Sequence, residues 1–264
     1  MLSKNKRKSV IVGLITAFLC LLLLVASGTI FFFIQQQAGK ATGSNRQTVT
    51  PTATMTKIAR SPTIPLVNRP LFFDNFADKS KGWSLGSAPG YKRMIDNSTL
   101  RLANSSHKIL TESLPTETIF TDFIVTVAFT IVKADKDDSV GLYVRGDSNL
   151  DHDYRIDIYG NNTYAISKEL LNANKTPLVN TLVNPSSTSV LHPVGQQNIL
   201  TVMMKGPLLV LLINTRVTSS VTDTDYTAGQ IALFVQNSPT SSGVEASFKS
   251  IVVYPAPKQL PTAN

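Results

Sequence analysis

Residues 198–214 read NILTVMMKGPLLVLLIN, two apolar runs joined by Lys205-Gly206-Pro207. Glycine and proline between apolar runs favour a tight turn, because glycine adopts backbone angles that other residues avoid and proline cannot continue a hydrogen-bonded ladder. The runs are short and rich in the aliphatic side chains of buried strands. The segment therefore predicts a β-hairpin with strands over 198–204 and 208–214.

The same pattern continues on both sides of this hairpin. From Leu71 onward no segment shows the 3.6-residue spacing of a helix, whereas short apolar or alternating runs recur every ~10–14 residues. The other expected strands cover 71–76, 91–95, 100–103, 108–113, 122–132, 140–145, 154–159, 163–170, 216–221, 230–236 and 244–254. About a dozen strands predict an all-β fold, an antiparallel two-sheet jelly-roll sandwich over residues 70–256.

The excess of basic charge lies before this domain. Nine of the 25 Lys and Arg residues precede Asp74, whereas all 17 Asp and Glu residues lie from Asp74 onward. The domain is thus nearly neutral, and a basic surface for nucleic-acid phosphates is not expected. The single cysteine, Cys20, excludes an internal disulfide framework and a cysteine-rich zinc site.

Residues 10–34 form a stretch of 25 positions without a charged side chain. As a helix it would be about 37 Å long at ~1.5 Å per residue, enough to cross a bilayer core of ~30 Å. Basic residues crowd the preceding segment and favour its cytoplasmic side. We therefore expect a cytoplasmic stub over 1–9, a signal-anchor helix over 10–34 in the lipid bilayer of the cell membrane, and an extracellular domain. The rival interpretation is a cleaved signal peptide, whose apolar core is normally ~7–15 residues long.

Residues 35–69 are rich in Thr, Ser, Gln, Pro and Ala and contain five basic and no acidic residues. Such a composition buries too little apolar surface to offset the entropy of ordering. It predicts a disordered linker between the membrane helix and the domain. A short disordered tail is expected over 257–264.

Several segments resemble concanavalin A-like lectin and glucanase jelly rolls. Residues 198–214, VTDTDYTAGQIALFV over 221–235 and VEASFKSIVVY over 244–254 are similar to the C-terminal half of that fold. FDNF over 73–76 followed by Gly82-Trp83 resembles its opening strand, and VGLYVR over 140–145 with DYRIDI over 153–158 resembles its central strand pair. Within this group, the segments most resemble laminin-G-like modules and the 3-keto-disaccharide hydrolase-type domain of bacterial surface proteins. The resemblance implies a concave face that binds glycans and sometimes proteins.

The glucanases among these relatives use two or three carboxylates at alternating positions of one strand. The glutamates of this chain, Glu112, Glu117, Glu169 and Glu245, are scattered, so it has no such Glu-x-Asp cluster. Its three histidines lie far apart in sequence, which gives a Ser-His-Asp triad or a zinc site no local support. We therefore expect binding without catalytic residues.

Strand alternation predicts the binding residues. In the run 142–145 the aliphatic side chains would face the core, which leaves Tyr143 and Arg145 exposed on the concave face. Asp153, Arg155 and Asp157 would join them from the neighbouring strand. Such a surface can hydrogen-bond sugar hydroxyls beside an aromatic ring. The alternative is an ordinary hydrated sheet face.

A calcium loop is one interpretation of residues 147–153. Asp147, Asn149, Asp151 and Asp153 place oxygen ligands at alternating positions, and calcium favours oxygen ligands. However, His152 stands where the EF-hand turn needs glycine, and Ile158 stands where its bidentate glutamate should be. The alternative is a polar hairpin tip. Asp74 and Asp78 form a second candidate pair for calcium.

These observations predict a membrane-tethered extracellular module that binds a polysaccharide or another surface glycan without cleaving it. Two alternatives stay open: a glycoside-processing enzyme of the 3-keto-disaccharide hydrolase type, and a protein-interaction or sensor ectodomain. A cytoplasmic stub of nine residues holds no signalling domain, which favours tethering over sensing.

Overall fold

The computed structural model describes residues 69–258, except 173 and 175. The expected stub, membrane helix, nearly all of the linker and most of the tail lie outside these residues. Contacts divide the chain into the units Met1–Thr63 and Ile64–Asn264, and the described residues belong to the second. No helix long and apolar enough to cross a membrane occurs among the described residues.

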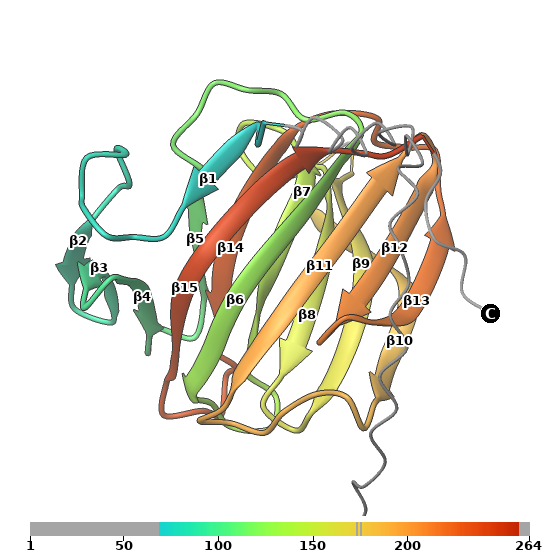
Figure 1. The fold of residues 1–264 in the computed structure, drawn as a ribbon. Coiled ribbons are helices and arrows are strands. Elements are labelled where there is room, and N and C mark those ends of the chain that lie inside the picture. Colours follow the sequence, from blue (N-terminus) through green and yellow to red (C-terminus); the bar gives the residue numbers. More distant parts are fainter. Residues whose placement is uncertain (1–68, 173, 175, 259–264) are drawn as a thin grey trace, which may run out of the picture. The chain divides into compact units, whose positions relative to one another are not determined.

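The described residues form two antiparallel sheets that lie face to face, as the all-β prediction requires (Figure 1). Sheet A has the strand order β13-β12-β11-β6-β15-β4-β3-β2, and β1 also pairs with β15. Its strands are β1 Phe72–Asp74, β2 Gly86–Ala88, β3 Tyr91–Asp96, β4 Thr99–Asn104, β6 Phe123–Lys133, β11 Gln197–Lys205, β12 Leu208–Ile213, β13 Arg216–Thr222 and β15 Val244–Pro255.

Sheet B has the strand order β10-β9-β8-β7-β14-β5. Its strands are β5 Ile109–Ser113, β7 Ser139–Gly146, β8 Asp153–Tyr159, β9 Thr163–Leu171, β10 Pro177–Ser187 and β14 Gln230–Gln236. Among the described strands, seven pairs join neighbours in sequence and six join strands far apart in the chain; β15 at the end of the domain, for example, lies between β4 and β6. Such long-range pairing is typical of a jelly roll and makes the fold depend on contacts far apart in the chain.

The hairpin predicted from residues 198–214 is confirmed. Strands β11 and β12 pair from Leu200 opposite Ile213 to Lys205 opposite Leu208, so the connection is only Gly206-Pro207. Gly206 has a φ of 50°, a left-handed conformation that glycine adopts without steric cost. Each expected strand overlaps a strand of the structure. Two strands, β2 and β10, are additional.

The main core fills the space between the sheets. In β6 the inward positions Phe123, Val125, Val127, Phe129 and Ile131 are all buried and alternate with partly exposed residues. Sheet B contributes inward side chains from β7, β8 and β14 to the same cluster. Each buried side chain of this kind stabilises the fold by about 1.5–3 kcal/mol, so the alternation drives the two sheets together.

Candidate functional site

The face of sheet B that points away from the main core is the candidate site, and we call it the outer face of sheet B. On β8, Tyr154, Ile156 and Ile158 belong to the main core. The alternating residues Asp153, Arg155 and Asp157 therefore share the outer face, as the sequence predicts. Tyr143 on β7 lies directly opposite Arg155, so it shares this face as well.

The expected exposure of these side chains is wrong. Tyr143 is 2% exposed, Arg155 7% and Asp153 0%, and Asp157 is buried too. Tyr143 belongs to a second small cluster, in which it packs with Phe234 and Ala232 of β14 and with Leu150 from the loop before β8. The rings of Tyr143 and Phe234 have centroids 5.0 Å apart. The outer face thus has its own packed layer.

Arg155 lies at the centre of this layer. Its guanidinium carbon is 4.6 Å from the Phe234 ring centroid and 5.8 Å from that of Tyr143, within range of cation–π attraction. Its nitrogens donate to Asp157 Oδ1 at 2.6 Å, to Glu169 Oε1 at 2.9 Å and to Gln236 Oε1. Burial alone would lower the pKa of Arg155, but Asp157, Tyr143 and Glu169 raise it above its ordinary value. The guanidinium is therefore charged and held in one orientation.

Asp157 is the best-supported carboxylate of the site. Ser139 Oγ donates to its Oδ1 at 2.7 Å, and Arg155 donates to the same oxygen through Nε and Nη2. All three hydrogen bonds end on Oδ1, and none from the described residues reaches Oδ2. Asp157 therefore keeps one acceptor oxygen available for a ligand.

Asp153 has the opposite environment. Neither of its carboxyl oxygens has a hydrogen-bond partner among the described residues, although the side chain is completely buried. Burial, and then the negative charge of Glu169 directly opposite on β9, raise the pKa of Asp153 to about 9. Asp153 is therefore protonated at neutral pH, because an unpaired buried charge is far more costly than a neutral carboxylic acid.

The predicted calcium ligands do not converge. Asp147 Oδ1 accepts hydrogen bonds from the backbone N–H groups of Asp151 at 2.8 Å and Asn149 at 3.2 Å, as in a polar hairpin tip. Within 69–258, no group of three or more His, Cys, Asp or Glu side chains is placed to hold a metal ion. Asp74, in the second candidate pair, accepts from Trp83 Nε1 at 2.6 Å. Calcium binding stays a prediction from the sequence.

Arg145 does not belong to the outer face, contrary to the expectation. It has a φ of 53° and lies at a register shift between β7 and β14, where Gln230 pairs with Gly146 but Ile231 pairs with Val144. Such a bulge adds one unpaired residue and redirects its side chain. The guanidinium is buried and donates to the carbonyl oxygens of Thr121, Gly206 and Tyr226. Arg145 therefore links the three loop segments that contain Thr121, Gly206 and Tyr226.

A cavity of about 170 Å³ opens on the outer face, and we call it the outer-face pocket. It is lined by Arg155, Asp157, Tyr159, Ala165, Ser167, Val179, Thr181, Pro185 and Gln236. Strands β10 and β14 both contribute, although β9, β8 and β7 lie between them. Strands are ~4.8 Å apart, so a flat sheet would separate these two by roughly 19 Å. The single lining residue from β14 is Gln236, whose side chain extends to Arg155 on β8 and accepts a hydrogen bond from it.

Of the five predicted binding residues, Arg155 and Asp157 line the pocket, whereas Tyr143 and Asp153 lie buried beside it and Arg145 lies elsewhere. Sequence reasoning missed the polar lining residues Ser167, Thr181 and Gln236 and the aromatic Tyr159. Alternation on β9 and β14 could have identified Ser167 and Gln236, because both are out of phase with buried aliphatic neighbours. Thr181 had no such signal, because its strand was not expected.

No protein-family model matches the chain, and no curated protein matches its sequence. Many solved structures share the fold. A Bacillus subtilis protein of unknown function with a galectin-like fold gives a TM-score of 0.53 at 14% identity, covering 72% of this chain and 97% of that chain. A GH16 protein of the Bacteroides ovatus mixed-linkage glucan locus, in complex with a G4G4G3G product, gives 0.52 at 9% identity, covering 69% and 99%.

A structure from work on endo-acting O-glycanases of the human gut microbiota gives a TM-score of 0.53 at 10% identity, covering 72% of this chain and 100% of that chain. At such low identities the likeness concerns the fold alone. The described domain thus has the jelly-roll fold that the sequence predicts, similar to the fold of these galectin-like and GH16 structures.

Proposed function

We propose that the domain is a glycan-binding module and that the outer-face pocket is its binding site. One observation carries the proposal: the buried pair Arg155 and Asp157 forms a fixed polar floor that opens into a cavity beside the ring of Tyr159. Binding sites for small polar ligands combine a concave surface with a few firmly positioned polar groups. The jelly-roll neighbours include a GH16 protein solved with a bound oligosaccharide, which supports the ligand class.

The chemistry of the pocket suits sugar hydroxyl groups. A hydroxyl both donates and accepts, and the pocket offers a carboxylate acceptor in Asp157, a cationic donor in Arg155 and an amide in Gln236. The hydroxyls of Ser167, which pairs in register with Arg155, and of Thr181, which pairs with Ser167, also line the pocket. Because Arg155 and Asp157 already hold each other in place, little conformational freedom remains to be lost on binding.

Glycoside cleavage is the second candidate function, because Asp153, Asp157 and Glu169 place three carboxyl groups on one face. A protonated acid and an ionised carboxylate are the groups that glycosidases use. The arrangement favours binding, however, since Asp153 is closed off from solvent and both Asp157 and Glu169 are bound to Arg155. A general acid must reach the leaving oxygen within hydrogen-bond distance.

We further propose that residues 10–34 tether this module to the cell membrane with the domain outside. The uncharged length of the segment and the basic residues before it support this orientation. Protease added to intact cells should remove the domain and leave the N-terminus protected. Protection of the domain in intact cells, with digestion only after lysis, would overturn the proposed orientation.

The test of glycan binding uses the full chain in detergent micelles on a glycan array and on insoluble polysaccharides, with product analysis in parallel. A Thr181→Trp variant fills the pocket from the edge strand β10, and Thr222→Trp is the matched control on the edge strand β13. We expect retention of a defined glycan that Thr181→Trp abolishes and Thr222→Trp preserves, with no product.

Product formation would favour the enzyme, and loss of retention in EDTA would support the predicted calcium loop. Equal retention by both tryptophan variants would remove the outer-face pocket from the proposal. No binding to any glycan would contradict the proposal and favour a protein partner.

A further inference from the structure

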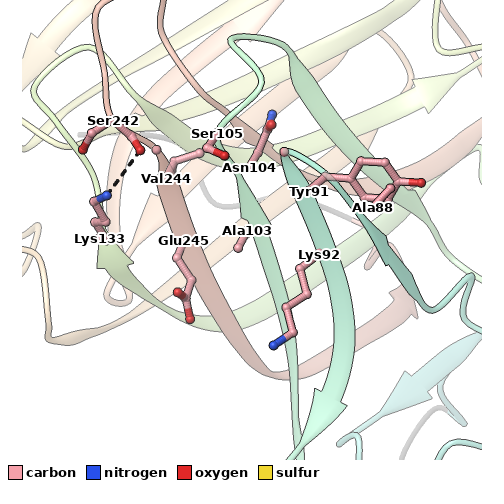
Figure 2. A pocket seen from close by; sticks show the side chains of 12 residues that line it. Ala88, Tyr91, Lys92, Ala103, Asn104, Ser105, Lys133, Ser242, Val244 and Glu245 are labelled. Carbon is pink, nitrogen blue, oxygen red and sulfur yellow. Dashed lines mark hydrogen bonds between the residues drawn. The ribbon is translucent and has the colours of Figure 1, made fainter.

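A second cavity, of about 300 Å³, lies on the outer face of sheet A, and we call it the sheet A cavity (Figure 2). A row of residues in register crosses it: Lys92 on β3 pairs with Ala103 on β4, Ala103 with Glu245 on β15, and Glu245 with Lys133 on β6. Because the adjacent residue Leu102 is buried in the main core, alternation turns the row toward solvent.

The hollow arises because small residues interrupt this row of long side chains. Ala103 contributes a single methyl group between Lys92 and Glu245, and Figure 2 shows it at the centre of the cavity. Gly243 forms part of the rim with a φ of 132°. A Cβ atom at Gly243 would lie 3.2 Å from the carbonyl oxygen of Asn104 and 3.7 Å from Lys133 Nζ. A larger residue there would be strained and would crowd Lys133.

The charged side chains around the cavity differ in whether they have an ion-pair partner. Arg101 donates through Nε, at 3.0 Å, and through Nη2 to the same oxygen of Glu245, so this carboxylate already has a cationic partner. Lys133 Nζ makes only a long contact of 3.4 Å with the carbonyl oxygen of Ser242. Neither Lys92 nor Lys133 forms an ion pair with a described residue. Lys92 and Lys133 therefore lie on either side of Ala103 and Glu245, with Lys133 Nζ turned toward Ser242 (Figure 2). Because Glu245 is already paired with Arg101, these two lysines leave the lining with an excess of positive charge.

We propose that the sheet A cavity binds an acidic sugar residue, with its carboxylate attracted by the excess positive charge of Lys92 and Lys133. A water molecule takes ~30 Å³ of liquid, so the cavity has room for roughly ten, far more than an isolated carboxylate needs. The remaining lining can accommodate the ring and its hydroxyls: Ser105 and Ser242 provide hydroxyl groups and Tyr91 an aromatic side chain. Asn104 holds the rim by donating to the Lys108 carbonyl oxygen at 2.6 Å.

This site is independent of the outer-face pocket, because its residues belong to the other sheet. A chain with both sites would bind a polysaccharide containing neutral and acidic residues at two places, which raises avidity without any new contact. The sheet A cavity would then select for carboxylated polymers.

Calorimetric titration of the full chain in detergent micelles tests the proposal with three probes: trigalacturonate, its neutral methyl ester and inorganic phosphate. We expect trigalacturonate to bind at least tenfold more tightly than the ester, and to bind more weakly at high salt. Lys92→Ala and Lys133→Ala should each weaken binding a few times, and the double variant about tenfold. Lys79→Ala, an exposed lysine outside the cavity, is the matched control.

Three outcomes would overturn the proposal. Equal affinity for the acid and the ester would show that the lysines recognise no carboxylate, and phosphate binding as tightly as trigalacturonate would show a simple anion site. Unchanged binding in the Lys92→Ala/Lys133→Ala double variant would place the ligand elsewhere. If Thr181→Trp abolished that binding, trigalacturonate would occupy the outer-face pocket, and the function proposed for that pocket would survive without the sheet A cavity.

Discussion

Arg155 Nη2 lies 2.6 Å from Asp157 Oδ1, and the two residues are separated by a single position on β8. Residues two apart on a strand point to the same face, so the strand itself brings these opposite charges together. Both side chains are more than nine-tenths buried. A buried ion pair of this kind fixes its own geometry, because each charge has lost its water and depends on the other.

Removal of the arginine should therefore be costly. We expect Arg155→Met to lower the free energy of unfolding by about 3–5 kcal/mol, because it leaves Asp157 and Glu169 without their shared cation. Urea denaturation followed by circular dichroism measures the change. Arg101→Met is the control: its ion pair with Glu245 is partly exposed and should contribute less than about 1 kcal/mol. Equal losses in the two variants would contradict the role given to Arg155.

Asp153 should make the domain less stable as pH rises. The folded-state pKa is raised to about 9, whereas an unfolded aspartate titrates near ~3.9. The folded state thus binds one more proton between these values, so stability is highest below pH ~4 and falls as pH rises toward 9. Asp153→Asn keeps the shape without the titrating group and should raise stability at pH 7 by about 1–3 kcal/mol. Denaturation at several pH values would reveal a flatter profile, and an unchanged slope would refute this account.

The same substitution at Asp138 should have the opposite sign. Burial by itself would raise the pKa of Asp138, but donors from Ser241, Ser238, Asp135 and Asn237 lower it below its ordinary value. The stabilising contribution of this carboxylate is therefore present above pH ~4 and is lost as pH falls through the lowered pKa. Asp138→Asn would turn an amide N–H₂ toward these donors and should cost about 2–3 kcal/mol at pH 7. Thermal unfolding of both Asp→Asn variants in one buffer tests the contrast, and a stabilised Asp138→Asn variant would contradict it.

Arg145 should matter for stability and not for ligand binding. Its guanidinium is buried, donates to three backbone carbonyl oxygens and pairs with Asp122, so Arg145→Ala removes all of these hydrogen bonds and leaves a hole where the side chain packs. We expect a loss of about 3 kcal/mol with unchanged glycan affinity in the folded fraction. Arg145→Lys keeps the charge but not the planar fork and should restore only part of the loss. If Arg145→Ala weakened glycan binding while the protein kept its wild-type stability, Arg145 would be a binding residue.

The fold class could be predicted from the sequence because apolar and polar residues alternate along each half-buried strand. The alternation in FIVTVAFTIVK over 123–133 shows which side chains meet the main core, and Gly206-Pro207 marks the turn of the β11–β12 hairpin. Strand β10 shows no such alternation. It lies at the edge of sheet B, and its side chains are mostly exposed, with Val179 at 58%. Without a buried face, a strand has no apolar period to detect.

The candidate site also combines features that the sequence predicts with features that only tertiary structure sets. Sequence alternation by itself determined that Asp153, Arg155 and Asp157 share one face opposite Tyr154, Ile156 and Ile158, because the period of a strand is a local property. Tertiary structure decided the rest. The bulge at Arg145 depends on pairing with a strand some 85 residues later, since Gln230 lies opposite Gly146. The raised pKa of the Asp153 carboxyl depends on its burial between packed elements and on Glu169, which the pairing of β8 with β9 places opposite it.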